Sequence, residues 1–138
     1  MIEFSRRIEI EKVVKTLDGV VDIFASDEEC EKLKNRFGFL KITSLSLKGV
    51  IKEREYGKTF RFKGVLTAEI IQKCMETEKP VEESIEEKIE ILLTYKMKDD
   101  VDYLEDIEEI DSGFVDFGEI SSQYLSLSAS PYPLCKTF

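Results

Sequence analysis

The sequence predicts an α+β fold: a single domain over residues 1–138, with a mainly antiparallel sheet of long hairpins and two short helices. Its length of 138 residues suits one domain and leaves no room for two sizeable ones. Apolar and polar residues alternate along residues 40–72, which is the period of strands with one buried face. Two further segments carry helical spacing behind a capping residue. These three observations together favour strand hairpins packed against helices.

The N-terminal segment is expected to form a strand. Apolar residues alternate with polar ones there, at Ile2, Phe4, Ile8 and Ile10, and Arg6 interrupts the apolar row. An irregular stretch that includes Leu17, Gly19 and Val20 is expected to follow.

A helix is predicted over about residues 27–37. Ser26 followed by Glu29 three positions later forms the capping pattern of a helix start. The apolar residues Cys30, Leu33 and Phe37 recur at spacings of three and four. Gly38 stands where a left-handed C-terminal cap belongs, so the helix should end at residue 37.

Two long antiparallel strands are predicted on either side of a turn at residues 56–58, where Gly57 supplies the turn. Alternation puts one apolar set on a shared face of each strand: Leu45, Leu47, Gly49 and Ile51 on the first, and Phe60, Phe62, Gly64, Leu66, Ala68 and Ile70 on the second.

Residues 81–95 fit two kinds of element. The helical set is Val81, Ile85, Ile89 and Leu92, whereas the extended set is Ile85, Ile89, Ile91, Leu93 and Tyr95. The pattern alone leaves both open.

Residues 99–111 carry eight acidic residues and no basic one, which is typical of a solvated or partly disordered connection. A calcium-binding EF-hand loop is disfavoured because the glycine in the middle of such a loop is absent.

A second helix is predicted over about residues 117–128. Asp116 and Glu119 mark its start, one face carries Ile120, Tyr124 and Leu127, and Pro131 and Pro133 follow its end.

Composition argues against an enzyme. The chain has no histidine, and its three cysteines, Cys30, Cys74 and Cys135, are widely spaced with no CxxC pair. The common general base, nucleophile pairs and zinc sites therefore lack their usual residues, and no GxGxxG, GxxxxGK[ST], HExxH or GxSxG motif occurs. We expect no catalytic residue, metal, cofactor or small-molecule substrate. No apolar stretch suggests a membrane span or a secretory signal, so a cytoplasmic protein is expected.

The charge is unevenly distributed. Residues 1–75 hold 15 Lys and Arg against 12 Asp and Glu, whereas residues 76–138 hold 5 against 17. Because the whole chain has a net charge of −9, any contact with RNA must be local. Six cations in residues 48–63 are the candidate phosphate contacts: Lys48, Lys52, Arg54, Lys58, Arg61 and Lys63. For the Phe60-Arg61-Phe62-Lys63 run, stacking of the rings on bases is the alternative to a core position.

Two segments resemble the signatures of the bacterial YceD family. The first carries Gln72, Cys74, Thr77, Pro80 and Val81 in the spacing QxCxxTxxPV, and the second carries Asp116, Gly118, Glu119, Gln123, Leu125, Leu127, Pro131 and Pro133. The resemblance covers about residues 37–133 in the family's order. Many members add a cysteine-containing tail after the Pro-x-Pro segment, whereas this chain has Cys135 alone.

The resemblance implies a non-enzymatic ribosome-biogenesis factor that supports accumulation of large-subunit ribosomal RNA, through ribosomal RNA or a ribosome-assembly protein. It also implies that residues 81–95 are a strand paired with residues 59–72. From the residues alone, Cys74 is expected to be a small, half-buried residue at a strand end, and Thr77 and Pro80 to shape a turn. The alternative function is an acidic protein-interaction adaptor without direct RNA contact. An RNA-acting enzyme with magnesium at the acidic cluster is disfavoured, because the run of carboxylates is dense but does not indicate convergence on one site.

Overall fold

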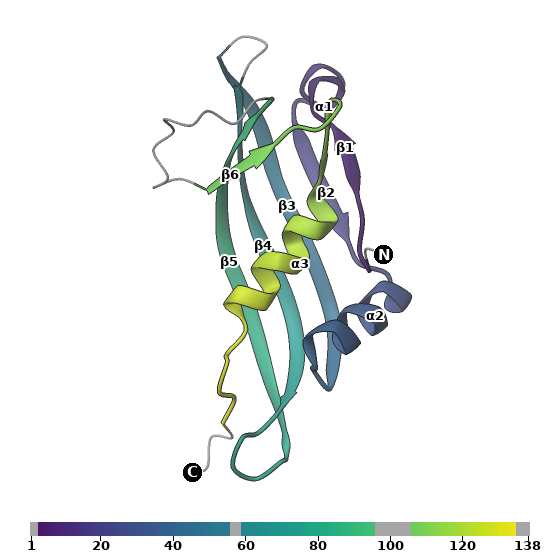
Figure 1. Cartoon of the computed structure of the whole chain (residues 1–138), viewed down its shortest axis with the longest axis vertical. Helices are drawn as coiled ribbons and strands as arrows, with labels where there is room; N and C mark the ends of the chain where they lie inside the picture. Colours follow the sequence, from purple (N-terminus) through teal and green to yellow (C-terminus); the bar gives the residue numbers. More distant parts are fainter. Residues whose placement is uncertain (1–2, 56–58, 96–105, 135–138) are drawn as a thin grey trace.

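The computed structural model describes residues 3–55, 59–95 and 106–134 and has mixed α+β content (Figure 1). Its elements follow in the order β1 (Arg7–Glu9), α1 (Ile10–Thr16), β2 (Val20–Phe24), α2 (Asp27–Phe37), β3 (Lys41–Glu55), β4 (Thr59–Lys73), β5 (Pro80–Thr94), β6 (Asp106–Glu109), β7 (Phe114–Asp116) and α3 (Phe117–Ser128). No helix among these residues is long and apolar enough to cross a membrane.

Five strands form the main sheet, in the order β2-β3-β4-β5-β6. The pairs from β2 to β5 are antiparallel, whereas β6 runs parallel to β5. The predicted pairing of residues 59–72 with residues 81–95 is confirmed, since Ala68 lies opposite Ile85 and Phe62 opposite Ile91. The helical alternative for residues 81–95 is therefore wrong.

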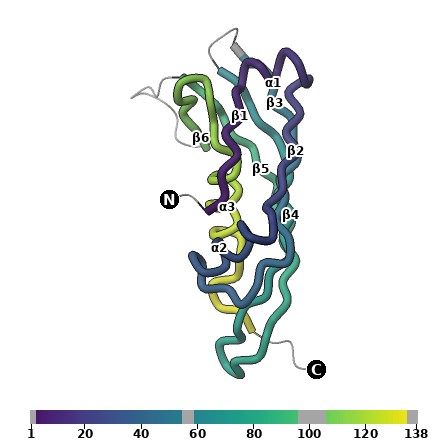
Figure 2. The backbone as a smooth tube through the Cα atoms, turned by 90° about the vertical axis from the view of Figure 1, so that its right-hand side faces the viewer, coloured from purple at the N-terminus to yellow at the C-terminus, as the bar shows by residue number. Residues whose placement is uncertain are grey.

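The sheet is covered on one face and open on the other (Figure 2). The helices α2 and α3 and the two-stranded β1-β7 pair lie on the covered face, and α3 crosses it diagonally (Figure 1). The helix α1 lies at one end, where it leads from β1 into β2. Among the described residues, no helix or strand packs on the second face of the sheet.

The core lies between the covered face and α3. The rings of Phe62 and Phe117 pack with centroids 4.9 Å apart. Gly49 and Gly64 pair directly across β3 and β4, and a Cβ atom at either would lie within 2.7 Å of the Phe62 ring. The two glycines therefore make room for this ring at the centre of the sheet.

Both predicted helices are confirmed, and α2 shows how local the signals are. The Ser26 hydroxyl accepts from the backbone N–H of Glu29, and the Glu29 carboxylate accepts from the N–H of Ser26, which completes the capping box. Gly38 ends the helix in the left-handed region, with φ of 74°.

The predicted apolar face of α3 is partly wrong, because Leu127 is 80% exposed. The row that faces the sheet contains Phe117, Ser121 and Leu125, all fully buried. The Ser121 hydroxyl donates to the Phe117 carbonyl at 2.8 Å, so the serine is satisfied within its own helix. A small side chain at this position lets the helix approach the sheet closely. The polarity of serine alone would not predict that it faces the sheet.

Three other sequence predictions need correction. The N-terminal strand is only Arg7–Glu9, because Ile10 begins α1. The stretch expected to be irregular contains α1 and the edge strand β2. Part of the acidic segment forms β6 and places Ile110 in the core, where the prediction was a solvated connection. The expected turn at residues 56–58 lies outside the described residues.

Candidate nucleic-acid interface

The open face of the sheet carries five of the six predicted phosphate contacts. Alternation along β3 and β4 turns them away from the core, at Lys48, Lys52, Arg54, Arg61 and Lys63. Lys58 lies outside the described residues. We call this set, with Lys88 of β5, the cationic face.

The strand register sets the spacing of the cationic face. Lys52 lies opposite Arg61, Lys63 opposite Val50, and Lys48 opposite Val65. Val65 in turn lies opposite Lys88 of β5, so Lys48 and Lys88 flank it in one cross-strand row. Successive rows lie about 7 Å apart, because a strand rises about 3.3 Å per residue. Cations therefore recur along the sheet at intervals of one row.

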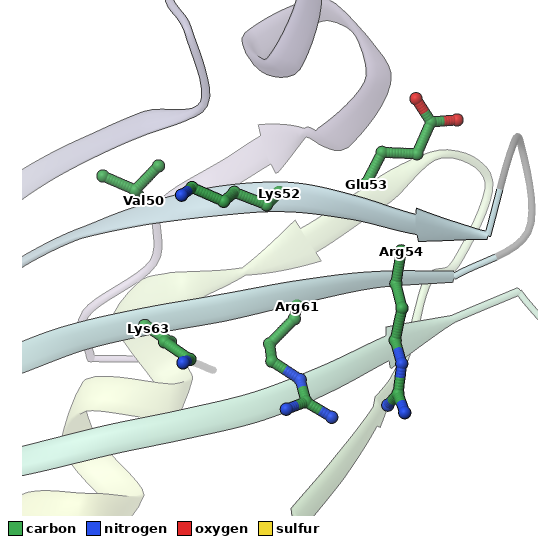
Figure 3. A pocket seen from close by; sticks show the side chains of 6 residues that line it. All are labelled: Val50, Lys52, Glu53, Arg54, Arg61 and Lys63. Atoms are coloured by element: carbon green, nitrogen blue, oxygen red, sulfur yellow. The ribbon is translucent and has the colours of Figure 1, made fainter.

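Two adjoining depressions follow the cationic face. The larger, of about 510 Å³, is lined by Val50, Lys52, Glu53, Arg54, Arg61 and Lys63 (Figure 3). The second, of about 400 Å³, shares Lys63 and extends to Lys88. Figure 3 shows the Glu53 side chain pointing away from that of Arg54, so the carboxylate is not directed among the guanidinium groups.

Two carboxylates stand beside the cations of this face: Asp22 of β2, which lies opposite Lys48, and Glu90 of β5. Glu90 accepts from the Arg61 guanidinium at 2.9 Å and lies 3.9 Å from the Lys63 ammonium group. The Glu90, Arg61 and Lys63 side chains all reach solvent, so separating these ion pairs costs little free energy. An incoming phosphate can therefore compete with Glu90 for both cations.

Stacking of Phe60 and Phe62 on bases, the alternative to a core position, is wrong. Their side chains are 1% and 0% exposed on the covered face, where they belong to the core. The favoured prediction, with the rings in the core and Arg61 and Lys63 on the opposite face, is confirmed.

Lys88 is a basic residue of this face that the sequence analysis did not single out. Its orientation depends on whether residues 81–95 are extended, and the apolar spacing left that open. Once β5 pairs with β4, even-numbered residues of β5 turn to the open face.

The first of the two segments that resemble YceD signatures forms a turn between β4 and β5. Cys74 is 2% exposed, more deeply buried than expected, and its backbone N–H donates to the Lys79 carbonyl at 2.8 Å. The Thr77 hydroxyl accepts from the N–H of Lys79 at 3.4 Å, and Pro80 begins β5. Thr77 and Pro80 therefore shape a turn, as predicted.

The second signature segment fastens the N-terminal residues to α3. The Asp116 carboxylate caps α3 and also accepts from the N–H of Arg6 at 2.8 Å. Glu119 pairs with Arg36 of α2 at 3.0 Å. A Cβ atom at Gly118 would lie 2.6 Å from the Phe4 carbonyl oxygen, so only glycine fits this approach. These contacts give Asp116, Gly118 and Glu119 structural roles.

A smaller groove of about 230 Å³ separates α3 from β6 and carries acidic groups. The Tyr124 hydroxyl donates to the Asp106 carboxylate, and burial together with that hydrogen bond raises the pKa of Tyr124. Burial also raises the pKa of Glu108. Within residues 3–55, 59–95 and 106–134, no three potential metal-ligating side chains come together.

Comparison with known proteins gives no relative from which to transfer a function: no family model, curated protein or solved structure matches the chain.

Proposed function

We propose that this protein is a non-enzymatic, cytoplasmic ribosome-biogenesis factor that supports accumulation of large-subunit ribosomal RNA by binding RNA on the cationic face. The observation that carries the proposal is the gathering of Lys48, Lys52, Arg54, Arg61 and Lys63 on a sheet face that no described element covers. Phosphate oxygens are the groups that such lysines and arginines recognise.

The net charge of −9 does not exclude this contact. At physiological ionic strength, charges separated by more than about 8 Å of solvent are largely screened from one another. A phosphate chain on β3 and β4 therefore responds mainly to the cations beside it. The acidic residues of the chain limit non-specific binding elsewhere and favour one orientation of the RNA.

The resemblance of residues 72–81 and 116–133 to the YceD signatures supports the same function from the sequence side. Those segments lie away from the cationic face, in the turn after β4 and around α3, and their contacts are structural. In this account they stabilise the framework, and the open sheet face contacts RNA.

A protein-interaction adaptor is the second candidate function. The acidic groove between α3 and β6 favours it, because apolar Ile107 and Leu127 stand beside Asp106 and Glu108 there. Such a groove suits a basic protein segment. In this alternative the protein influences ribosomal RNA without touching it.

An affinity pull-down from cell lysate, with and without nuclease, separates the two candidates. RNA binding predicts that large-subunit ribosomal RNA is recovered, and that ribosomal proteins held through it disappear after nuclease treatment. Protein partners that persist after nuclease treatment, with no ribosomal RNA recovered, would instead support the adaptor.

A cellular test addresses the biological role. Depletion of the protein should lower the ratio of large-subunit to small-subunit ribosomal RNA, and wild-type protein should restore it. The variant with Lys48, Lys52, Arg61 and Lys63 changed to glutamine should not. A matched control changes Lys12, Lys15, Lys32 and Lys79, which are exposed on α1, on α2 and in the turn between β4 and β5, and should restore the ratio.

A further inference from the structure

We propose that the open face is built for single-stranded RNA, with Phe24 of β2 as the platform on which an unpaired base stacks. This inference rests on the proposed function and names the class of RNA that the same face binds. Phe24 lies in the stretch that was expected from the sequence to be irregular and that forms β2.

Phe24 stands on the open face. Along β2, Val21 and Ile23 turn toward the core, whereas Val20, Asp22 and Phe24 turn outward. The Phe24 side chain is 68% exposed, which leaves a large apolar ring in solvent. Among the described residues of the five-stranded sheet, every other aromatic side chain belongs to the covered face.

The position of Phe24 relative to the cations suits one RNA strand. Phe24 lies opposite Ser46, and the next cross-strand row contains Lys48 opposite Asp22. The row beyond that contains Val50 opposite Lys63. An RNA base stacked on the ring therefore places the RNA backbone beside Lys48, about 7 Å along β3, and directs the RNA toward the depression at Lys63.

The ring distinguishes single-stranded from double-stranded RNA. Bases of an A-form duplex are already stacked and paired, so proteins recognise them mainly through phosphates and 2′-hydroxyl groups. Unpaired bases are free to stack on an aromatic side chain, whatever their sequence. The lysines bind the phosphates of either form of RNA, whereas the Phe24 ring stabilises only the complex with unpaired bases.

The location of Phe24 on an edge strand makes the ring accessible. In the strand order of the sheet, β2 stands at the end, beside β3 alone. Ser46 beside the ring is small, so a flat base has space to lie over Phe24. The row next to the ring pairs Asp22 with Lys48, and the rows beyond it carry the other lysines and arginines of the cationic face. This run of cations favours RNA over a second copy of the chain.

The test measures the affinity of wild-type protein and variants for two fluorescently labelled RNAs of equal length, an unstructured single strand and a hairpin duplex. F24L keeps an apolar side chain and removes the ring, and F24Y keeps the ring. Tyr132→Leu is the matched control, because Tyr132 is an exposed aromatic residue in the segment after α3.

The expected result is that F24L weakens binding of the single strand by about tenfold or more, the usual effect of losing one stacked base. Binding of the duplex should be unchanged. F24Y and Y132L should bind as wild type, and circular dichroism should show that all variants are folded.

Two results would overturn the inference while leaving the proposed function intact: F24L binds the single strand as tightly as wild type, or it loses affinity for both RNAs equally. If F24L instead turns a dimer into a monomer in sedimentation experiments, the face is an interface between copies and the inference is wrong. Wild-type protein that binds neither RNA at physiological salt would contradict both proposals.

Discussion

Gln72 of β4 and Ser130, two residues beyond α3, are joined by a hydrogen bond of 3.0 Å from the Gln72 amide to the Ser130 carbonyl oxygen. The same amide donates to the Glu83 carboxylate of β5 at 3.1 Å, and that carboxylate accepts from the N–H of Ser130. Met75 adds a backbone hydrogen bond to the Pro133 carbonyl at 2.8 Å. The two segments that resemble the family signatures are therefore fastened to each other.

Changing Gln72 to leucine should release the segment after α3. Two hydrogen bonds are removed, and the part-buried Glu83 carboxylate loses one of its donors, so the free energy of unfolding should fall by about 1–3 kcal/mol. Denaturant unfolding gives this value, and limited proteolysis should cut the C-terminal segment faster. Gln123→Leu, at an exposed position of α3, is the control and should change little. Equal effects of the two changes would contradict this role for Gln72.

Changing Gly64 to alanine should strain the centre of the sheet. The new Cβ atom would stand 2.6 Å from both the Lys48 carbonyl oxygen and the Phe62 ring, and the backbone oxygen has no room to yield. We expect a loss of about 1–3 kcal/mol or more in the free energy of unfolding.

Gly38→Ala is the comparison for that change, because no atom lies within 4 Å of a Cβ atom there. Its left-handed φ of 74° alone should cost about 1–2 kcal/mol. A Gly64→Ala variant as stable as wild type would show that the Phe62 site is more loosely packed than described.

Acid should weaken the protein through Glu29. The hydrogen bonds from the Arg6 guanidinium, at 2.7 Å, and then those from Ser26 lower the pKa of Glu29 to about 2 from its ordinary value of 4.5. A carboxylate with a lowered folded-state pKa adds stability that is present above about pH 4.5 and is lost as the pH falls toward about 2.

The variant Glu29→Gln should therefore show a flatter loss of stability between about pH 4.5 and pH 2, measured by denaturant unfolding across that range. Glu28→Gln is the control on the same helix turn, since Glu28 is exposed. If the Glu29→Gln variant loses stability as steeply as wild type when the pH falls, the Arg6 contact does not persist in solution.

The parts of the fold predicted correctly are those with local signals. Ser26 and Gly38 fix the ends of α2, and strict alternation fixes β3 and β4. The strand β2 has apolar residues on both faces, because Val20 and Phe24 are exposed while Val21 is buried. A period of two is therefore invisible in it, and its place beside β3 depends on residues far away in the sequence.

The candidate site was predicted in part for the same reason. Alternation was enough to place Arg61 and Lys63 opposite the buried phenylalanines. Whether Glu90 and Lys88 lie on the open face depends on the register of β5, because a shift of one residue would turn both side chains to the covered face. Phe24 could have been found only by pairing β2 with the open edge of β3.

The central claim, that the cationic face binds RNA phosphates, is tested most directly by the salt dependence of RNA affinity. Wild-type protein, the variant with Lys48, Lys52, Arg61 and Lys63 changed to glutamine, and the matched control with Lys12, Lys15, Lys32 and Lys79 changed are titrated between about 50 mM and 200 mM salt. For the first variant we expect weaker binding and a flatter slope of log affinity against log salt, by about 0.7 for each single-strand phosphate that it no longer neutralises, with the control like wild type. A folded first variant with the affinity and slope of wild type would contradict the claim.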